Sequence, residues 1–135
     1  MARYLIDSHI FFWAIDAPDR LLGPERAIVE NPAEDIAVSV ASFWELSIKL
    51  AKGTLGLSPG KAPIGPDYFS KQAAIAGFAV LPIEAAEAEH VRSLPRIHGD
   101  PFDRLLIAQG VLSRRVILTR DDLFARYPGV QVFVP

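Results

Sequence analysis

Short apolar strands alternate with helices along this chain, and that alternation limits the folds open to it. Continuous apolar runs separated by helical segments are typical of a parallel sheet that is covered on both faces. We therefore expect an α/β domain with a central, mainly parallel, twisted sheet of about five strands and helices on both faces. The strands are expected at Arg3–Ile6, Ile36–Ser39, Phe78–Leu81, Arg115–Leu118 and Val130–Val134.

Residues that begin or end helices mark the segments between these strands. Pro24 and Pro101 suit the first turn of a helix, whereas Gly53 and Gly77 suit the position just after the last turn. Residues 53–66 hold four glycines and three prolines and are expected to form a surface loop. The helices are expected over about His9–Ala17, Pro24–Glu30, Phe43–Lys52, Pro66–Ala76, Ile83–Ser93, Phe102–Ser113 and Thr119–Arg126.

Bulk properties place the chain in a broad class. Its 135 residues suit one domain over residues 1–135, and half of them are apolar. A net charge of -2 argues against a surface coated in basic residues, but leaves room for a local basic rim. The start of the chain lacks a signal-peptide pattern, and its apolar run Ile10–Ile15 is far shorter than a membrane span. We expect a soluble, cytoplasmic protein with no membrane partner.

Four acidic residues stand where an expected strand or loop passes into a helix. Asp7 directly follows the first strand, and Glu45, Asp103 and Asp121 lie near the starts of later helices. Helices in such folds run back against the strands, so helix N-termini and strand carboxyl ends lie on the same side. We therefore expect the four carboxylates to converge on one edge of the sheet.

The first two acids also have purely structural interpretations. Asp7 would complement the dipole of the helix that follows it, with Ser8 as the N-cap of that helix. Glu45 stands three residues after Ser42 and completes a capping box with it. Such terms stabilise a helix by roughly 0.3–2 kcal/mol each, yet they do not require the helices to start on the same side of a sheet.

The other two acids have similar alternatives. Asp100 before Pro101 is a natural N-cap, which leaves Asp103 in the first turn of that helix. Thr119 would cap a last short helix, with Asp121 in its first turn. Position favours a joint role, because these acids are flanked by apolar segments that are expected to be buried.

Carboxylates held close together repel one another, and a divalent cation is the usual way to stabilise them. Mg²⁺ and Mn²⁺ prefer carboxylate oxygens and water, and they activate water for attack on a phosphodiester. The chain has no cysteines, which excludes disulfides, zinc-thiolate sites and thiol nucleophiles. The leading interpretation is a metal-dependent hydrolase that acts on a nucleic-acid backbone.

The segments around the four acids also resemble a known family. These segments are Leu5–His9, Ser42–Leu46, Asp100–Gln109 and Leu118–Asp121. Together they resemble PIN-domain ribonucleases, in particular the VapC toxins of prokaryotic toxin–antitoxin pairs. The resemblance runs in register over nearly the whole chain, and its third segment is the most specific.

This resemblance implies cleavage of RNA by water that is activated by Mg²⁺ or Mn²⁺. Ser8 stands where the family usually has Thr or Ser, so it would hydrogen-bond a carboxylate or a metal-bound water. Asp100 is an extra acid and a second candidate. The resemblance also implies a homodimer and a small antitoxin whose C-terminal segment sends an Arg or Lys into the acidic pocket. The metal-binding and catalytic acids would be Asp7, Glu45, Asp103 and Asp121.

Basic residues near the expected site are candidates for contact with RNA phosphates. They include Lys49, Arg104 and Arg120, and Arg104 would equally serve to neutralise the acids. Arg115 stands at the far end of its helix, where we expect only complementation of the helix dipole.

Histidine and aromatic residues are further candidates for a place in or near the site. His9 is expected to orient the site or pack beside it, and His98 is a possible substrate contact in the loop before Asp100. No histidine pair has the spacing of a metal-ligand motif. Trp13 would stack a base of a single strand, although its helical spacing favours a place in the core or at a dimer surface.

Two other function classes remain open at this point. An acid-lined fold also suits a catalytically silent module whose main role is to bind a partner protein. A receiver-type phosphoryl-transfer domain places acids at strand ends too, but it needs a lysine late in the chain. No lysine follows Lys71, which makes this class the weakest of the three.

Overall fold

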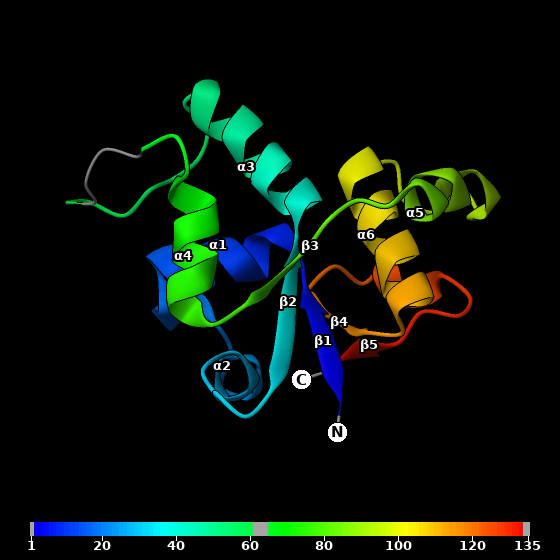
Figure 1. The fold of residues 1–135 in the computed structure, drawn as a ribbon, viewed down its shortest axis with the longest axis horizontal. Helices are drawn as coiled ribbons and strands as arrows, with labels where there is room; N and C mark the ends of the chain where they lie inside the picture. Colours follow the sequence, from blue (N-terminus) through cyan, green and yellow to red (C-terminus); the bar gives the residue numbers. More distant parts are fainter. Residues whose placement is uncertain (1, 61–64, 134–135) are drawn as a thin grey trace.

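The computed structural model describes residues 2–60 and 65–133, and its centre is a five-stranded sheet in the order β3-β2-β1-β4-β5. Each neighbouring pair of strands is parallel, which confirms the expected α/β architecture (Figure 1). The strands are β1 (Arg3–Ile6), β2 (Asp35–Ser39), β3 (Ala79–Leu81), β4 (Val116–Leu118) and β5 (Val132–Phe133).

Helices connect the strands as the sequence predicts, with small shifts at their ends. The expected loop over residues 53–66 lies partly outside the described residues. The α-helices are α1 (Ser8–Asp16), α2 (Gly23–Val29), α3 (Val40–Ala51), α4 (Tyr68–Ala76), α5 (Ala85–His90) and α6 (Pro101–Ser113). Short 3-10 helices cover Pro18–Arg20, Val91–Ser93 and Phe124–Arg126.

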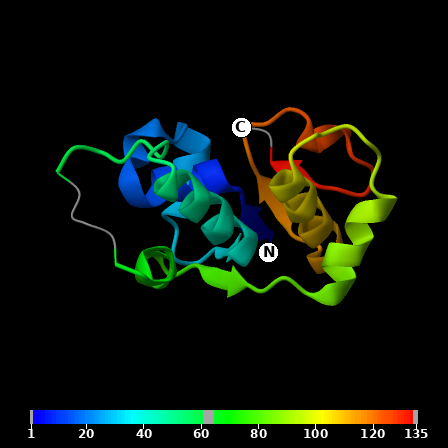
Figure 2. The same cartoon turned by 90° about the horizontal axis from the view of Figure 1, so that it is seen from above.

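Helices cover both faces of the sheet, and β1 shows why. Tyr4 and Ile6 point into a core built with α1, α3 and α4, whereas Leu5 points to the opposite core beneath α6. Leu5 and Ile6 are both fully buried, and each such side chain stabilises the fold by about 1.5–3 kcal/mol. Figure 2 shows these two layers of helices on either side of the strands.

Parallel pairing brings three chain segments together at the carboxyl edge of the sheet. Ile6 is in register with Val38 on one side and with Leu118 on the other. The backbone N–H of Asp7 donates to the carbonyl of Leu118 at 3.1 Å, which extends the ladder by one bond. The start of α1, the start of α3 and the segment after β4 therefore lie side by side.

Helix α3 begins three residues earlier than the sequence predicts. Helix α3 begins at Val40, and its N-cap is Ser39, whose hydroxyl accepts a hydrogen bond from the N–H of Ala41 at 3.0 Å. The expected capping box between Ser42 and Glu45 is therefore wrong, because both residues lie inside the helix.

The N-cap of α1 also differs from the expectation. Its cap is Asp7 rather than Ser8, since the Asp7 carboxylate accepts a hydrogen bond from the N–H of Ile10 at 2.8 Å. Ser8 is instead the first residue of the helix. The shift frees the Ser8 hydroxyl to contact another part of the molecule.

The predicted helix over Thr119–Arg126 is wrong except for its last turn. Only Phe124–Arg126 is helical, as a 3-10 turn. The Thr119 hydroxyl accepts from the N–H of Asp121 at 3.0 Å and donates to the Asp7 carboxylate at 2.6 Å. These side-chain bonds hold the segment in a turn, which competes with a helix.

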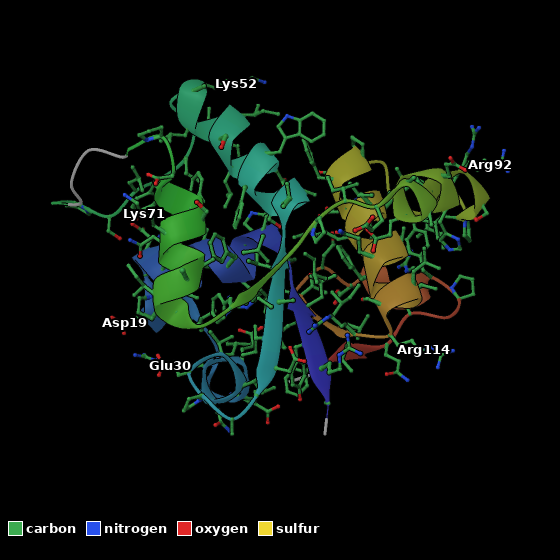
Figure 3. The ribbon with its side chains drawn as sticks, in the orientation of Figure 1. Asp19, Glu30, Lys52, Lys71, Arg92 and Arg114 are labelled. Atoms are coloured by element: carbon green, nitrogen blue, oxygen red, sulfur yellow. The ribbon has the colours of Figure 1, made fainter. Side chains whose placement is uncertain are left out.

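The end of α6 corrects the expectation for Arg115. Helix α6 stops at Arg114, which adopts a left-handed conformation with φ of 55° and points outward at the periphery of the molecule (Figure 3). Arg115 turns inward and is buried, where it donates to the carbonyl of Tyr4 at 3.1 Å and to the Asp35 carboxylate at 2.9 Å. Its role is to tie β4 to β1 and β2, which is more than dipole complementation.

The helices that the structure describes are too short or too polar to span a membrane. Within residues 2–60 and 65–133, none of them combines the length and the apolar character that a bilayer crossing requires.

Candidate metal centre

Asp7 is placed by the junction of β1 and α1. Its carboxylate is 5 % exposed, and its two oxygens accept hydrogen bonds from the Ile10 N–H at 2.8 Å and from the Thr119 hydroxyl at 2.6 Å. Burial raises the pKa of Asp7 above its usual value, although these two bonds oppose that rise. The side chain is thus fixed in one orientation before any ligand binds.

Asp103 is placed by the first turn of α6. Asp100 caps this helix by accepting hydrogen bonds from the N–H of Phe102 at 2.8 Å and of Asp103 at 3.3 Å. Burial, followed by repulsion from Asp100 and Glu45, raises the pKa of Asp103 to about 7. The Asp103 carboxylate therefore stands in a setting that is short of positive charge.

Glu45 reaches the site from the middle of α3. The Ser8 hydroxyl lies 2.6 Å from one Glu45 oxygen and 2.9 Å from the Ser42 hydroxyl, which joins α1 to α3. The other Glu45 oxygen lies 3.5 Å from the ammonium group of Lys49, one helical turn away. Among the residues that the structure describes, Glu45 is thus the one predicted acid with a lysine partner.

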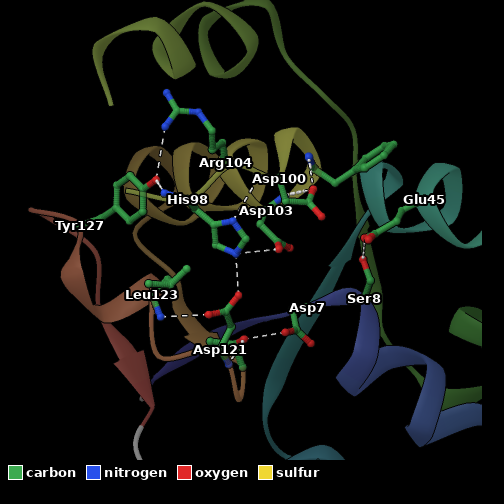
Figure 4. Close-up of polar contacts among 12 residues, drawn as sticks. Asp7, Ser8, Glu45, His98, Asp100, Asp103, Arg104, Asp121, Leu123 and Tyr127 are labelled. Atoms are coloured by element: carbon green, nitrogen blue, oxygen red, sulfur yellow. Dashed lines mark hydrogen bonds and ion pairs between the residues drawn. The ribbon is translucent and has the colours of Figure 1, made fainter. Parts of the chain in front are cut away.

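Asp121 lies in the turn after β4 and contacts His98, which lies in the loop before α6. One of its oxygens accepts from the N–H of Leu123 at 3.0 Å, and the other lies 2.6 Å from Nε2 of His98. The same Nε2 atom lies 3.1 Å from an oxygen of Asp103. Figure 4 shows the imidazole between these two carboxylates.

The structure brings three of the four predicted acids to one cavity. Its volume is about 280 Å³, and its lining includes Asp7, Asp103 and Asp121 together with Trp13 and Arg120. Glu45 does not line this cavity, but its charge contributes to the raised pKa of both Asp7 and Asp103. It therefore lies close enough to belong to the same electrostatic cluster.

The donor set of this cavity fits a hard divalent cation. Across residues 2–60 and 65–133, no Lys or Arg lies within ion-pairing distance of Asp7, Asp103 or Asp121. Buried carboxylates without a basic partner are costly, and a cation with a preference for oxygen ligands would relieve that cost. The acids that would hold it are Asp7, Asp103 and Asp121, with Glu45 beside them.

Arg104 and Arg120, which are candidates for contact with RNA, both bind other groups of the protein. Arg104 donates to the carbonyls of Val91 at 3.0 Å and Pro95 at 2.8 Å, so its guanidinium secures the preceding loop and does not reach the acids. Arg120 binds the buried Glu25 carboxylate, with a shortest contact of 2.8 Å, and lies 4.6 Å from the centre of the Trp13 ring.

Lys49 has a different setting from these two arginines. It lines a neighbouring cavity of about 320 Å³, next to the one that holds the acids. His9 and Trp13 line both cavities, and their rings lie 5.7 Å apart. Aromatic and basic side chains therefore continue outward from the acidic cavity.

Sequence reasoning missed the roles of His98 and Thr119 in this site. His98 was considered only as a substrate contact, and Thr119 only as a helix cap. Both hold acids in place, through the contacts of His98 with Asp103 and Asp121 and of Thr119 with Asp7. A Thr directly after a strand that neighbours β1 was a usable signal for such a contact, whereas the fold of the loop before Asp100 gave none.

Comparison with known proteins gives one family and a set of similar structures. A model of the PIN domain matches residues 4–130. VapBC2 from Rickettsia felis, bound to a DNA fragment from its promoter, has a TM-score of 0.67 at 17% identity, over 96% of each chain. Comparison with curated proteins gives no match.

Two further solved structures are similar over nearly their whole length. A toxin–antitoxin complex from Klebsiella pneumoniae has a TM-score of 0.62 at 18% identity, over 98% of this chain and 97% of the other. FitAcB from Neisseria gonorrhoeae has a TM-score of 0.61 at 18% identity, with the same coverage. At such low identity these likenesses show a shared fold.

Proposed function

This chain belongs to the PIN domain family, and we propose that it is a metal-dependent endoribonuclease, the toxin of a type II toxin–antitoxin pair. PIN domains are in general nucleases, and the resemblance of the acidic segments points to RNA. The observation that carries the proposal is the single cavity lined by Asp7, Asp103 and Asp121, whose carboxylates have no Lys or Arg partner in the described part of the chain.

Each acid has a distinct part in this proposal. Asp7 and Asp103 are proposed to hold Mg²⁺ or Mn²⁺ directly, while Glu45 and Asp121 act partly through water. Ser8 and Thr119 fix two of these carboxylates by short hydrogen bonds of 2.6 Å each. A bound cation would supply activation of water and stabilisation of the leaving oxygen of the phosphodiester.

A single-stranded substrate suits the surroundings of the acids. His9 and Trp13 form a wall shared by the acidic cavity and its neighbour, and the neighbour also contains Arg20 and Lys49. Aromatic rings stack on bases of any sequence, and basic side chains bind phosphates. A strand that enters the acidic cavity would thus find stacking and charge contacts in the neighbouring cavity.

We also propose that the protein acts with a partner. The similar structures are described as VapBC2 and as a toxin–antitoxin complex, and an antitoxin is the corresponding partner for this chain. A homodimer is proposed as well, since Trp44 on α3 is 57 % exposed and packs at 4.9 Å against Phe102 on α6. A cation from a partner would compete with the metal for the same carboxylates.

Cleavage of a single-stranded RNA tests the proposal directly. The purified protein is incubated with the RNA in Mg²⁺, in Mn²⁺ and in EDTA, with a DNA strand of the same sequence alongside. We expect RNA cleavage that requires the metal and that places one oxygen from ¹⁸O-labelled water in the new phosphate. A 2′,3′-cyclic phosphate product would contradict hydrolysis by activated water.

The alternative is a catalytically silent module that binds a partner through the acidic cavity. It predicts tight binding of the partner but no binding of Mg²⁺ or Mn²⁺ in a calorimetric titration.

A further inference from the structure

We propose that His98 is a positioning residue, which holds the Asp103 and Asp121 carboxylates through a neutral imidazole N–H and does not itself bind the metal. The inference rests on the proposed metal-dependent function and concerns the same site. It assigns a role to a residue outside the four predicted acids. It also decides between two chemistries that the same cluster of atoms allows.

The first of these chemistries is metal ligation by the imidazole. One ligand atom each from His98, Asp103 and Asp121 lies within 4.8 Å of the others, which is close enough for a shared ion. An imidazole ligand would change the character of the site, since nitrogen favours transition metals whereas carboxylates suit Mg²⁺. Distance alone does not separate a ligand from a hydrogen-bond donor.

The hydrogen bond made by the second ring nitrogen of His98 distinguishes a metal ligand from a hydrogen-bond donor. The backbone N–H of Asp100 donates to Nδ1 of His98 at 3.1 Å. Nδ1 must therefore carry a lone pair, and in a neutral imidazole the proton then resides on Nε2. Metal ligation through Nε2 would need the opposite tautomer, with a proton on Nδ1 facing the Asp100 N–H.

The Nε2 proton has two acceptors in front of it. The Asp121 oxygen lies at 2.6 Å and the Asp103 oxygen at 3.1 Å from Nε2. Both carboxylates come from separate segments, the turn after β4 and the start of α6, and they repel each other. A shared donor reduces that repulsion and sets the spacing of the two groups.

The imidazole is held on its other sides, so the donor direction is fixed. The backbone N–H of His98 donates to the Tyr127 hydroxyl at 2.7 Å, and its ring packs edge-on against Phe124 at 5.8 Å. Arg104 donates to the same hydroxyl at 3.3 Å and thereby ties the loop to α6. Rotation of the ring would break the hydrogen bond from the Asp100 N–H and the edge-on contact with Phe124.

Nuclear magnetic resonance of the ¹⁵N-labelled histidines tests the tautomer. The chain has three histidines, and a His98→Ala variant assigns the signal of interest by its loss. We expect His98 to carry its proton on Nε2 both without metal and in excess Mg²⁺. A proton on Nδ1, or a Cd²⁺ coupling to Nε2 in protein loaded with ¹¹³Cd, would overturn the proposal.

Metal affinity provides the second measurement. Loss of an outer hydrogen bond to ligating groups typically costs 10–100-fold in metal affinity. His98→Ala is expected to weaken Mg²⁺ and Mn²⁺ binding by the same factor, about 10-fold or more. His98→Gln, whose amide reaches a similar position and donates, is expected to stay within about threefold of the wild type. His90→Ala, on α5, is the matched control with unchanged affinity.

The outcomes distinguish this proposal from the proposed function itself. A larger loss of Mn²⁺ than of Mg²⁺ affinity in His98→Ala, or no rescue by His98→Gln, would identify His98 as a ligand and overturn its positioning role. If the wild type binds neither ion, the proposed function fails, while the tautomer of His98 is still decided by the resonance measurement.

Discussion

Carboxylates at the two edges of the sheet have opposite electrostatic surroundings. At the amino edge, Asp35 at the start of β2 pairs with Arg115 at 2.9 Å and with Arg3 at 3.6 Å. At the carboxyl edge, Asp7 and Asp103 have no Lys or Arg partner among the residues that the structure describes. The molecule therefore has a neutralised acid at the amino edge of the sheet and acids without a Lys or Arg partner at the carboxyl edge.

The contrast separates a carboxylate that stabilises the fold from the carboxylates of the proposed site. Arg115 completes a set of bonds that fasten neighbouring strands, so the amino edge gains stability from its charges. At the carboxyl edge, burial and repulsion from neighbouring carboxylates destabilise the ionised form of Asp103. They therefore raise its pKa to about 7. A protein retains such a cost where a ligand removes it, and the proposed divalent cation would be that ligand.

The largest difference between the edges is expected in catalysis. Asp103→Asn and Asp7→Asn are expected to lower RNA cleavage at least about 100-fold, because each removes a charge that holds the cation. Asp35→Asn, at the opposite edge, is the matched control and is expected to keep wild-type activity. Initial rates of RNA cleavage at saturating Mn²⁺ measure the effect. An equal loss of activity in Asp35→Asn would contradict the proposed difference between the two edges.

The stability of the metal-free protein is expected to fall as the pH rises from about 4 to 7. In this range the folded protein keeps the Asp103 proton, whose pKa is about 7, while the unfolded chain, with a pKa of 3.8, has lost it. The unfolded state thus binds fewer protons than the folded state. The free energy of unfolding therefore decreases by a few kcal/mol over this range. The raised pKa of Asp7 acts in the same direction.

Urea unfolding in EDTA at several pH values measures this effect. Asp103→Asn is expected to be more stable than the wild type at pH 8 and to lose much of the pH dependence. Saturating Mn²⁺ is expected to restore stability to the wild type at pH 8. A wild type whose stability rises over the same range without metal would contradict uncompensated charge at this edge.

At the amino edge the expected effect is on folding alone. Arg115→Ala removes two hydrogen bonds of a buried guanidinium and is expected to lower the free energy of unfolding by about 2–3 kcal/mol. The half-exposed Asp35 keeps contact with water, so the loss stays below that of a fully buried pair. Chemical denaturation measures the loss, and cleavage per folded molecule is expected to be unchanged.

The smallest effect is expected from the hydroxyl that orients Asp7. Thr119→Val keeps the side-chain shape but removes the 2.6 Å bond to the carboxylate. We expect a decrease of about 10-fold in Mn²⁺ affinity by calorimetry. Thr54→Val, in a turn outside the acidic cavity, is the control.

Much of the fold follows from local sequence signals. The apolar runs and helix breakers predicted the order of strands and helices, because strands covered on both faces need little else to be recognised. Errors arose where side chains compete with the backbone over distance. Thr119 looked like a cap, yet its hydroxyl bonds to Asp7, which is 112 positions away in the chain.

The site was predictable to a smaller extent. Parallel strands bring Asp7 and the segment after β4 to one edge by topology, so their proximity could be inferred without coordinates. The imidazole of His98 could not be placed this way, since its position depends on the loop that Arg104 and Tyr127 secure. Arg115 was misjudged for the same reason, because only the register of three strands reveals its buried partners.

Binding of Mn²⁺ tests the central claim most directly, by paramagnetic resonance titration of the wild type, Asp103→Asn and Asp35→Asn. The account predicts that the wild type and Asp35→Asn bind the ion with equal affinity, while Asp103→Asn binds it at least about 10-fold more weakly. Equal binding by all three proteins, or binding by none, would contradict a metal centre at the carboxyl edge of the sheet.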